Sequence, residues 1–194
     1  RLGTSGQIAS EQEQRTLFQA VIGTGLLVIG MYHIGFYLFR RENSTLFFGL
    51  ASLALSLRTA FTGDMLAYRL FPAFPWEFGV KIEYLSVFCG ISFLVLYFYY
   101  LYEGNLRRSV SYGLSLTMIG ISLPILVLPA RIYTEWMNVY IAVLLLLVLY
   151  IVYGLVRAVR LRHIGARMNL LAAVVFLAAV LNDILYYNFV LETI

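Results

Sequence analysis

Long apolar runs separated by short polar gaps make up most of the chain. Six runs approach the length of a membrane-crossing helix, and they cover residues 17–39, 46–61, 78–102, 110–128, 136–156 and 168–187. A hydrocarbon core of about 30 Å needs roughly 20 apolar residues in a helix. Strands of a membrane barrel would instead alternate between apolar and polar positions, and these runs do not. The pattern therefore predicts an all-α, polytopic transmembrane helical bundle.

The composition favours an exterior that faces lipid. Hydrophobic residues make up 61% of the 194 residues, charged residues make up 12%, and the mean hydropathy is +0.84. A soluble domain has about 25% charged residues, because water faces most of its surface. The net charge of +4 would suit a nucleic-acid-binding protein, but the basic residues lie in short gaps between apolar runs. Composition thus excludes a soluble globular domain and argues against nucleic-acid binding.

The polar gaps predict the orientation of the bundle. The gaps after the first, third and fifth runs contain a set of arginines, which are Arg40, Arg41, Arg107, Arg108, Arg157, Arg160, Arg162 and Arg167. The positive-inside rule places these gaps in the cytoplasm, so both ends of the chain are expected outside it. Tyr133 and Trp136 flank one of the outer gaps, where aromatic side chains usually anchor helices at the headgroup level.

Several polar residues are predicted to share one depth near the outer ends of three runs. These candidate residues are Arg58, Lys81, Glu83, Tyr84, Asn182 and Asp183. A charge near the bilayer centre costs about 2.5–3.5 kcal/mol, so charges that persist there are usually paired or functional. An ion pair of Arg58 with Glu83 or Asp183 would satisfy both partners. Three interpretations remain open: a clasp that only fixes packing, a ligand pocket or latch with two states, and unpaired side chains that reach the interface.

The N-terminal segment is predicted to run into the first apolar run as one helix. Ser10 and Glu13 fit a capping box with Ser10 as the N-cap. Residues 1–13 would then be an extracytoplasmic linker and the start of this helix, with residues 1–7 as the linker proper. Residues 14–194 would form the transmembrane domain. The second run is expected to continue toward Met65, and Pro124 is expected to bend the fourth run.

The sequence lacks the motifs of an enzyme active site. It contains no His-Glu-x-x-His, no Gly-x-Ser-x-Gly and no phosphate-binding glycine loop. His33 lies in the first run, whereas His163 lies in an arginine-rich gap, so the two do not suit an intramembrane haem. Cys89 is the single cysteine and cannot form an internal disulfide. We therefore expect no catalytic residues, no cofactor and no metal site in this chain.

Four segments carry a resemblance to a known family. They are a glycine- and aromatic-rich first run that ends at Arg40, Arg58 late in the second run, Lys81-Ile82-Glu83-Tyr84-Leu85-Ser86, and Leu181-Asn182-Asp183-Ile184-Leu185-Tyr186-Tyr187-Asn188. Over residues 14–191 the chain resembles the bacterial seven-transmembrane receptors with diverse intracellular signalling modules. The resemblance implies a location in the bacterial inner membrane and a preceding extracytoplasmic sensory domain, often a carbohydrate-binding jelly roll. By analogy with the dimeric output enzymes of such receptors, it also implies a homodimer. It also implies a seventh helix, which this chain stops short of, and a cytoplasmic output module such as a histidine kinase or nucleotide cyclase.

Two functions from different classes remain in view. The resemblance favours a transmembrane signal-transducing domain that passes an extracytoplasmic signal to an output enzyme, as in a two-component system. The alternative is a small-solute transporter or permease. Transporters usually contain inverted repeats and helices that break near the membrane midplane. The chain shows one proline bend and no clear repeat, so signalling is the leading hypothesis.

Overall fold

The computed structural model describes residues 5–63 and 66–187, although the side chains of residues 5–11, 176 and 179–187 lie outside the described part. Within these ranges all regular structure is helical, which confirms the predicted all-α class. The helices are α1 (Ser5–Arg40), α2 (Asn43–Phe61), α3 (Leu66–Leu70), α4 (Trp76–Leu101), α5 (Arg108–Ser122), α6 (Pro124–Val127), α7 (Ala130–Glu135), α8 (Met137–Arg160) and α9 (Ala166–Tyr187).

Five segments of the described residues are long and apolar enough to cross a membrane. They are Gln12–Arg40, Asn43–Phe61, Trp76–Leu101, Arg108–Val127 and Met137–Arg160. These segments coincide with the first five predicted runs. The sixth predicted run coincides with α9, whose described apolar stretch, Ala166–Val175, is shorter than a membrane crossing. The polytopic helical architecture is therefore confirmed, with five described spans where the sequence predicts six.

Proline and glycine set two of the helix ends. The fourth span is interrupted at Leu123, because Pro124 begins α6 directly after α5 ends, as the predicted bend requires. The second run does not continue as a helix toward Met65. Instead α2 ends at Phe61, and the chain turns at Gly63, which has a φ of +68°.

The predicted capping box is wrong. The first helix begins at Ser5, so Ser10 lies one and a half turns inside α1 and is not its N-cap. Residues 5–7 of the predicted linker are accordingly helical. Gln7 and Ala9 favour a helix and no proline interrupts the segment, although Gly6 has poor helix propensity. The helix therefore begins before Ser10, the residue predicted to cap it.

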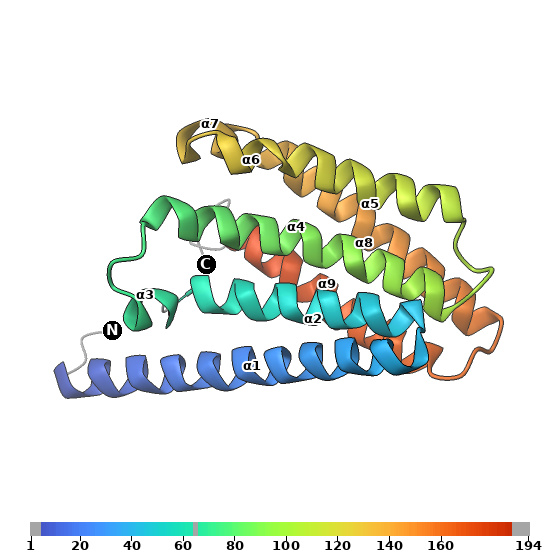
Figure 1. Ribbon diagram of the computed structural model, residues 1–194, viewed down its shortest axis with the longest axis horizontal. Helices are drawn as coiled ribbons and strands as arrows, with labels where there is room; N and C mark the ends of the chain where they lie inside the picture. The colour runs from blue at the N-terminus through green and yellow to red at the C-terminus, as the bar shows by residue number, and fades with distance from the viewer. Residues whose placement is uncertain (1–4, 64–65, 188–194) are drawn as a thin grey trace.

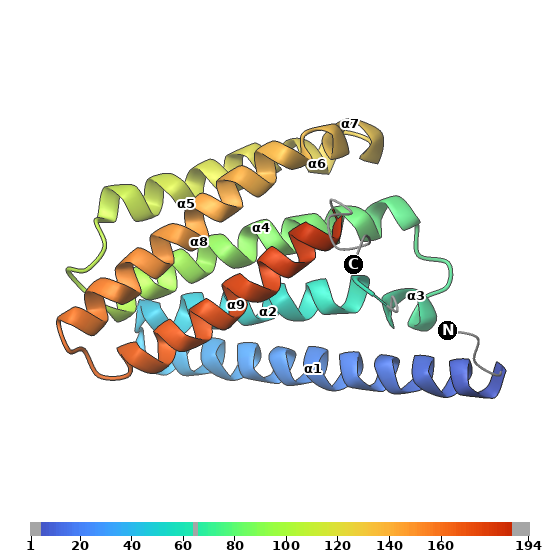
Figure 2. The same cartoon turned by 180° about the vertical axis from the view of Figure 1, so that it is seen from behind.

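The helices form two packed groups that share α4. In the first group α1, α2 and α4 lie side by side, and in the second α4, α5 and α8 surround the core, with α9 packed on α8 (Figures 1 and 2). The side chains of Val95, Met118, Leu147 and Leu155 are almost fully buried in this core. The α1–α2, α4–α5 and α8–α9 connections lie together at one end of the bundle, which we name the arginine-rich end (Figure 1). The N-terminus of α1, α3 and α7 lie at the opposite end.

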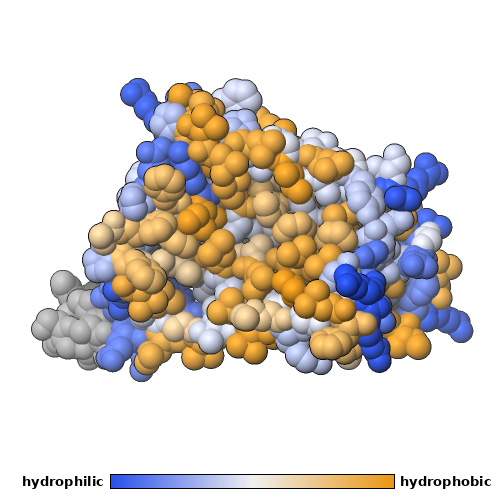
Figure 3. Space-filling view, viewed as in Figure 1, coloured by the Kyte–Doolittle hydropathy of each residue, from blue (hydrophilic) through white to orange (hydrophobic). Residues whose placement is uncertain are grey.

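The exterior of the bundle suits a bilayer. Large apolar side chains are exposed on every long helix with described side chains, for example Val21, Leu116, Leu149 and Val175. Apolar residues cover much of the middle of the molecule, while hydrophilic residues gather toward its two ends (Figure 3). A soluble monomer rarely exposes apolar patches larger than a few hundred Å². The broad apolar belt therefore identifies the side of the bundle as the surface that contacts lipid.

Candidate functional site

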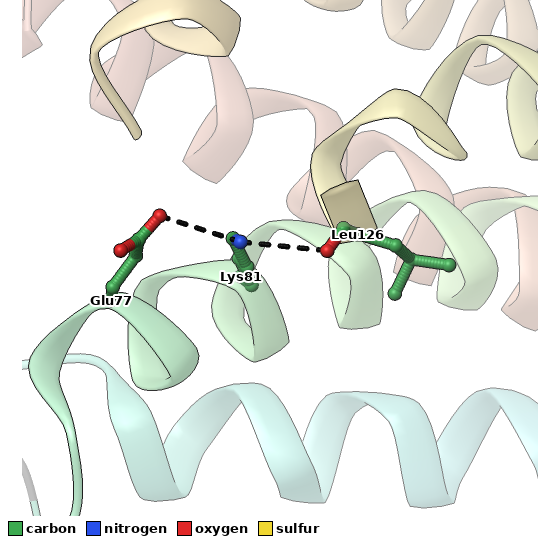
Figure 4. Close-up of polar contacts among 3 residues, drawn as sticks. All are labelled: Glu77, Lys81 and Leu126. Atoms are coloured by element: carbon green, nitrogen blue, oxygen red, sulfur yellow. Dashed lines mark hydrogen bonds and ion pairs between the residues drawn. The ribbon is translucent and has the colours of Figure 1, made fainter. Parts of the chain in front are cut away.

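Lys81 connects α4 to the interrupted fourth span at the opposite end. Its Nζ lies 3.4 Å from Glu77 Oε1 and donates to the Leu126 carbonyl oxygen over 3.4 Å (Figure 4). Only 14% of its side chain is exposed, whereas Glu77 is 46% exposed. Glu77 precedes Lys81 by one helical turn, an arrangement that stabilises a helical ion pair. Leu126 lies in the last turn of α6, where carbonyl groups lack helical partners and attract a cation.

Glu83 contacts the end of α2 through a hydroxyl group and not through Arg58. Thr62 Oγ1 donates to Glu83 Oε1 over 3.3 Å and to the Arg58 carbonyl oxygen over 2.8 Å. The ion pairs within the described side chains are Arg40–Glu42 and Lys81–Glu77, so the alternative of an Arg58–Glu83 pair is not formed there. Arg58 Nε is buried without a hydrogen-bond partner among the described atoms.

Two of the predicted residues cannot be placed against this set. The side chains of Asn182 and Asp183, near the end of α9, lie outside the described part. The predicted pairing of Arg58 with Asp183 therefore stays a prediction. Of the six candidates, Lys81, Glu83 and Tyr84 share the first turns of α4, and Arg58 lies in the last turn of the neighbouring α2.

Tyr133 lies beside the polar residues at the start of α4, a position that the sequence did not predict. The sequence predicts a headgroup anchor, and Trp136 fits that role because it is 59% exposed. Tyr133 is instead only 2% exposed, and its ring meets Tyr84 edge to face with centroids 5.8 Å apart. Its hydroxyl has no hydrogen-bond partner among the described residues. Burial first, and then the nearby Tyr84, Glu77 and Glu83, raise the pKa of Tyr133 to about 12.

A second polar set lies at the arginine-rich end, where the α4–α5 connection is buried. Tyr102, Asn105 and Leu106 are 4%, 2% and 5% exposed. Arg157 Nη1 donates to the Asn105 carbonyl oxygen over 3.1 Å, and Asn169 Nδ2 donates to the Tyr102 hydroxyl over 2.7 Å. These contacts tie the connection to α8 and α9. We name the set Tyr102, Asn105, Arg157 and Asn169 the arginine-end clamp.

The eight predicted anchor arginines are all exposed, and all lie at the arginine-rich end. Arg157 does more than anchor a helix, because it also belongs to the arginine-end clamp. Its partner is a backbone carbonyl, which leaves no signature in a sequence. Asn169 carries a weak signal, since an amide inside an apolar run needs a hydrogen-bond partner in lipid.

Metal chemistry has no candidate among the described side chains. No group of three or more His, Cys, Asp and Glu residues could hold an ion there. His33 donates or accepts a hydrogen bond with the Ile29 carbonyl of its own helix over 2.8 Å, and its ring packs against Phe48. Both contacts are those of a packed membrane-helix residue.

The apolar belt, the spans and the polar ends define a multi-pass membrane protein. Residues 15–194 match the family described as 7TM diverse intracellular signalling. The chain belongs to this family and is a transmembrane signalling receptor domain. No curated protein and no solved structure matches the chain.

Proposed function

We propose that this domain relays an extracytoplasmic signal to a cytoplasmic output module of a bacterial receptor, such as a histidine kinase or a nucleotide cyclase. Its place is the inner membrane, with the N-terminus outside the cytoplasm and the arginine-rich end inside. Membership of the signalling family supports the role. The exposed arginines at one end support the orientation, because basic residues are concentrated in cytoplasmic loops.

One observation carries the mechanism: a single unbroken helix reaches both polar sets. Near its start α4 carries Lys81, which binds the end of α6, and Glu83, which contacts the end of α2. Directly after its last residue comes Tyr102, which accepts the hydrogen bond of Asn169 on α9. A shift of α4 along its axis therefore changes contacts at both ends together. Coupling of this kind needs two arrangements with different contacts, which short polar bonds at helix ends can supply.

The family resemblance also suggests partners for this domain. We propose that the full-length receptor has a sensory domain before α1, that carbohydrates are among its signals, and that the receptor functions as a homodimer. The long α1, which extends to Ser5, supports this arrangement because it would project beyond the membrane toward such a domain.

Asn169→Leu tests the relay in the full-length receptor. The substitution removes the hydrogen bond to Tyr102 and leaves a side chain with the same number of heavy atoms and the same branching. Hydrogen bonds between membrane helices contribute about 0.6–1.7 kcal/mol, and about 1 kcal/mol changes a two-state ratio about fivefold. We therefore expect the basal activity of the output enzyme in isolated membranes to change about fivefold.

The matched control is Asn138→Leu, which makes the same replacement at an exposed position of α8. It should leave output activity unchanged. An Asn169→Leu receptor with normal membrane levels and the output activity of the control would refute the relay through α4. Solute uptake by proteoliposomes that contain only this domain would favour a transporter instead.

A further inference from the structure

A cavity of about 200 Å³ separates α9 from α2 and α4. Its walls are mainly aliphatic and aromatic, and they consist of Phe48, Ile91, Leu94, Tyr97, Phe98, Val148, Ile151, Val152, Asn169, Ala172 and Ala173. In the described part of the chain α9 packs against α8 and does not approach the backbone of α2 or α4 closely. The cavity is therefore the space left where a helix packs on only one neighbour.

The cavity lies in one half of the membrane-spanning layer. Asn169 and Phe48 lie within the first two turns of α9 and α2, which begin at the arginine-rich end. Ile91 and Val148 lie near the middles of α4 and α8. From Phe98 to Ile91 the wall extends about 10 Å along α4, at 1.5 Å per residue. Half of a hydrocarbon core is about 15 Å thick, so the cavity fits within one leaflet.

The cavity opens to the lipid-facing surface beside α9. Ala172 is exposed although it lines the cavity, and Ala173 beside it is half-buried. These small side chains leave the mouth unobstructed. Apolar cavities of about 150 Å³ stay dry and bind apolar molecules. At this depth the molecules outside the mouth are the acyl chains of the bilayer.

Positive charge at the arginine-rich end favours lipids with anionic headgroups. Arg41 directly precedes the first turn of α2, and Arg167 lies in the first turn of α9; both are exposed. Basic residues around a pocket between membrane helices attract anionic headgroups. We propose that the cavity binds one acyl chain of an anionic phospholipid from the leaflet at the arginine-rich end. The bound chain holds α9 at its distance from α2 and α4, next to Asn169 of the arginine-end clamp.

Photolabelling of the full-length protein in nanodiscs tests this proposal. The probe is a phosphatidylglycerol with a diazirine in its acyl chain, and the labelled residues are identified by mass spectrometry. Ile91 and Val148 are the informative positions, because they are only 5% and 3% exposed and lipid around the bundle does not reach them. We expect label on both, and much less label from a phosphatidylcholine with the same diazirine chain.

Ala173→Leu should abolish labelling at Ile91 and Val148, because the larger side chain projects into the cavity and obstructs its mouth. The matched control, Ala178→Leu, lies on the exposed side of α9 and should leave labelling unchanged. Ala172→Leu at the mouth provides a second blocking variant if Ala173→Leu does not fold. Label confined to exposed positions, equal labelling by both lipids, or full labelling of the folded blocking variants would overturn the proposal. These outcomes concern lipid binding alone and leave the output test of the relay intact.

Discussion

A buried hydroxyl without a partner is the least expected feature at the residue scale. Tyr133 is almost fully buried in α7 between the fourth and fifth spans, and two carboxylates and Tyr84 lie near it. An unpaired hydroxyl that is removed from water destabilises a fold by about 1–3 kcal/mol. Ionisation would be far less favourable, because the phenolate would be buried beside negative charges. Tyr133 therefore stays protonated under conditions in which an ordinary tyrosine ionises.

Tyr133→Phe should reduce the loss of stability at high pH. The pKa of Tyr133 is about 12 in the folded protein, against 10.0 for a free tyrosine. Between these values the unfolded chain loses a proton that the folded chain keeps, so the free energy of unfolding falls as the pH rises. The stability that the protonated Tyr133 contributes is fully present below pH 10.0, the pKa in the unfolded chain. It is lost as the pH rises through about 12, the pKa in the folded protein. Unfolding in detergent micelles at about pH 9 and about pH 11 should show a smaller decline for the variant.

Tyr153→Phe is the control for that measurement, because Tyr153 is 59% exposed on α8. It should decline with pH as the parent protein does. If Tyr133→Phe declined equally, the raised pKa of Tyr133 would be wrong.

The sequence shows where charged side chains interrupt the apolar runs, but it does not show which groups they contact. Charge in an apolar run identified Lys81 and Glu83, because hydropathy alone makes such residues conspicuous. The partners of Lys81 are a carboxylate one turn earlier and a carbonyl of α6, and the partner of Glu83 is Thr62. Carbonyl acceptors exist at every residue, so a sequence gives no signal for the one that is used. Tyr133 was missed because its burial depends on the packing of α7 against α4.

At the scale of the helices, glycines allow α1 and α2 to pack closely against each other. A Cβ atom added to Gly30 would lie 2.7 Å from Leu53 Cδ2 and 3.0 Å from the Gly49 carbonyl oxygen. Ser56 Oγ donates to the Gly23 carbonyl oxygen over 2.7 Å and joins the same two helices. Small residues that let backbones approach, together with hydrogen bonds between helices, are the usual means of packing in lipid.

Gly30→Ala should destabilise the bundle by about 1–3 kcal/mol, the usual effect of overpacking. The leucine side chain can move, but the Gly49 carbonyl can move only if the helices separate. Gly35→Ala is the matched control, because nothing lies within 4 Å of a Cβ atom added there. Unfolding of both variants by denaturing detergent measures the difference. Equal stability of the two variants would show that α1 and α2 are not held at this distance by Gly30.

Helix positions were largely predictable, because the length of an apolar run reflects the thickness of the bilayer. The break at Pro124 followed from the missing N–H group of proline. The start of α1 and the end of α8 were not predictable, because polar helical turns beyond the membrane carry no hydropathy signal. The helix α8 accordingly continues to Arg160, one turn past its predicted end.

At the scale of the whole molecule the arginine distribution predicts topology. Ile164 in the α8–α9 connection is 99% exposed, and Phe71 after α3 at the opposite end is 65% exposed. In a Cys89→Ser background, a membrane-impermeant maleimide should label Phe71→Cys in intact spheroplasts. It should label Ile164→Cys only after the membrane is permeabilised, because positive-inside loops face the cytoplasm.

Cells that express the Cys89→Ser protein without a new cysteine provide the blank. The reverse labelling pattern would invert the proposed orientation. Labelling of both positions in intact spheroplasts would contradict a single topology.

The order of helices in space could not be read from the sequence. Each apolar run predicts a helix but not its neighbours, because lipid accepts an apolar face on any side of a helix. The packing of α9 on α8, and the burial of the α4–α5 connection beneath them, depend on contacts such as Leu106 against Gly154. Such contacts join residues far apart in the chain.

The buried α4–α5 connection has a consequence for the synthesis of the protein. Asn105 and Arg157, which are joined by a hydrogen bond, lie 52 residues apart. A ribosome adds about 5–20 residues per second, so the Asn105 carbonyl waits about 3–10 s before its partner is even made. During that time α4 and α5 can pair through contacts of their own, such as the hydrogen bond from Ser115 Oγ to the Ser92 carbonyl oxygen, but their connection lacks the cover of α8. The buried state of this connection is therefore reached late in synthesis, after the fifth span has followed the fourth.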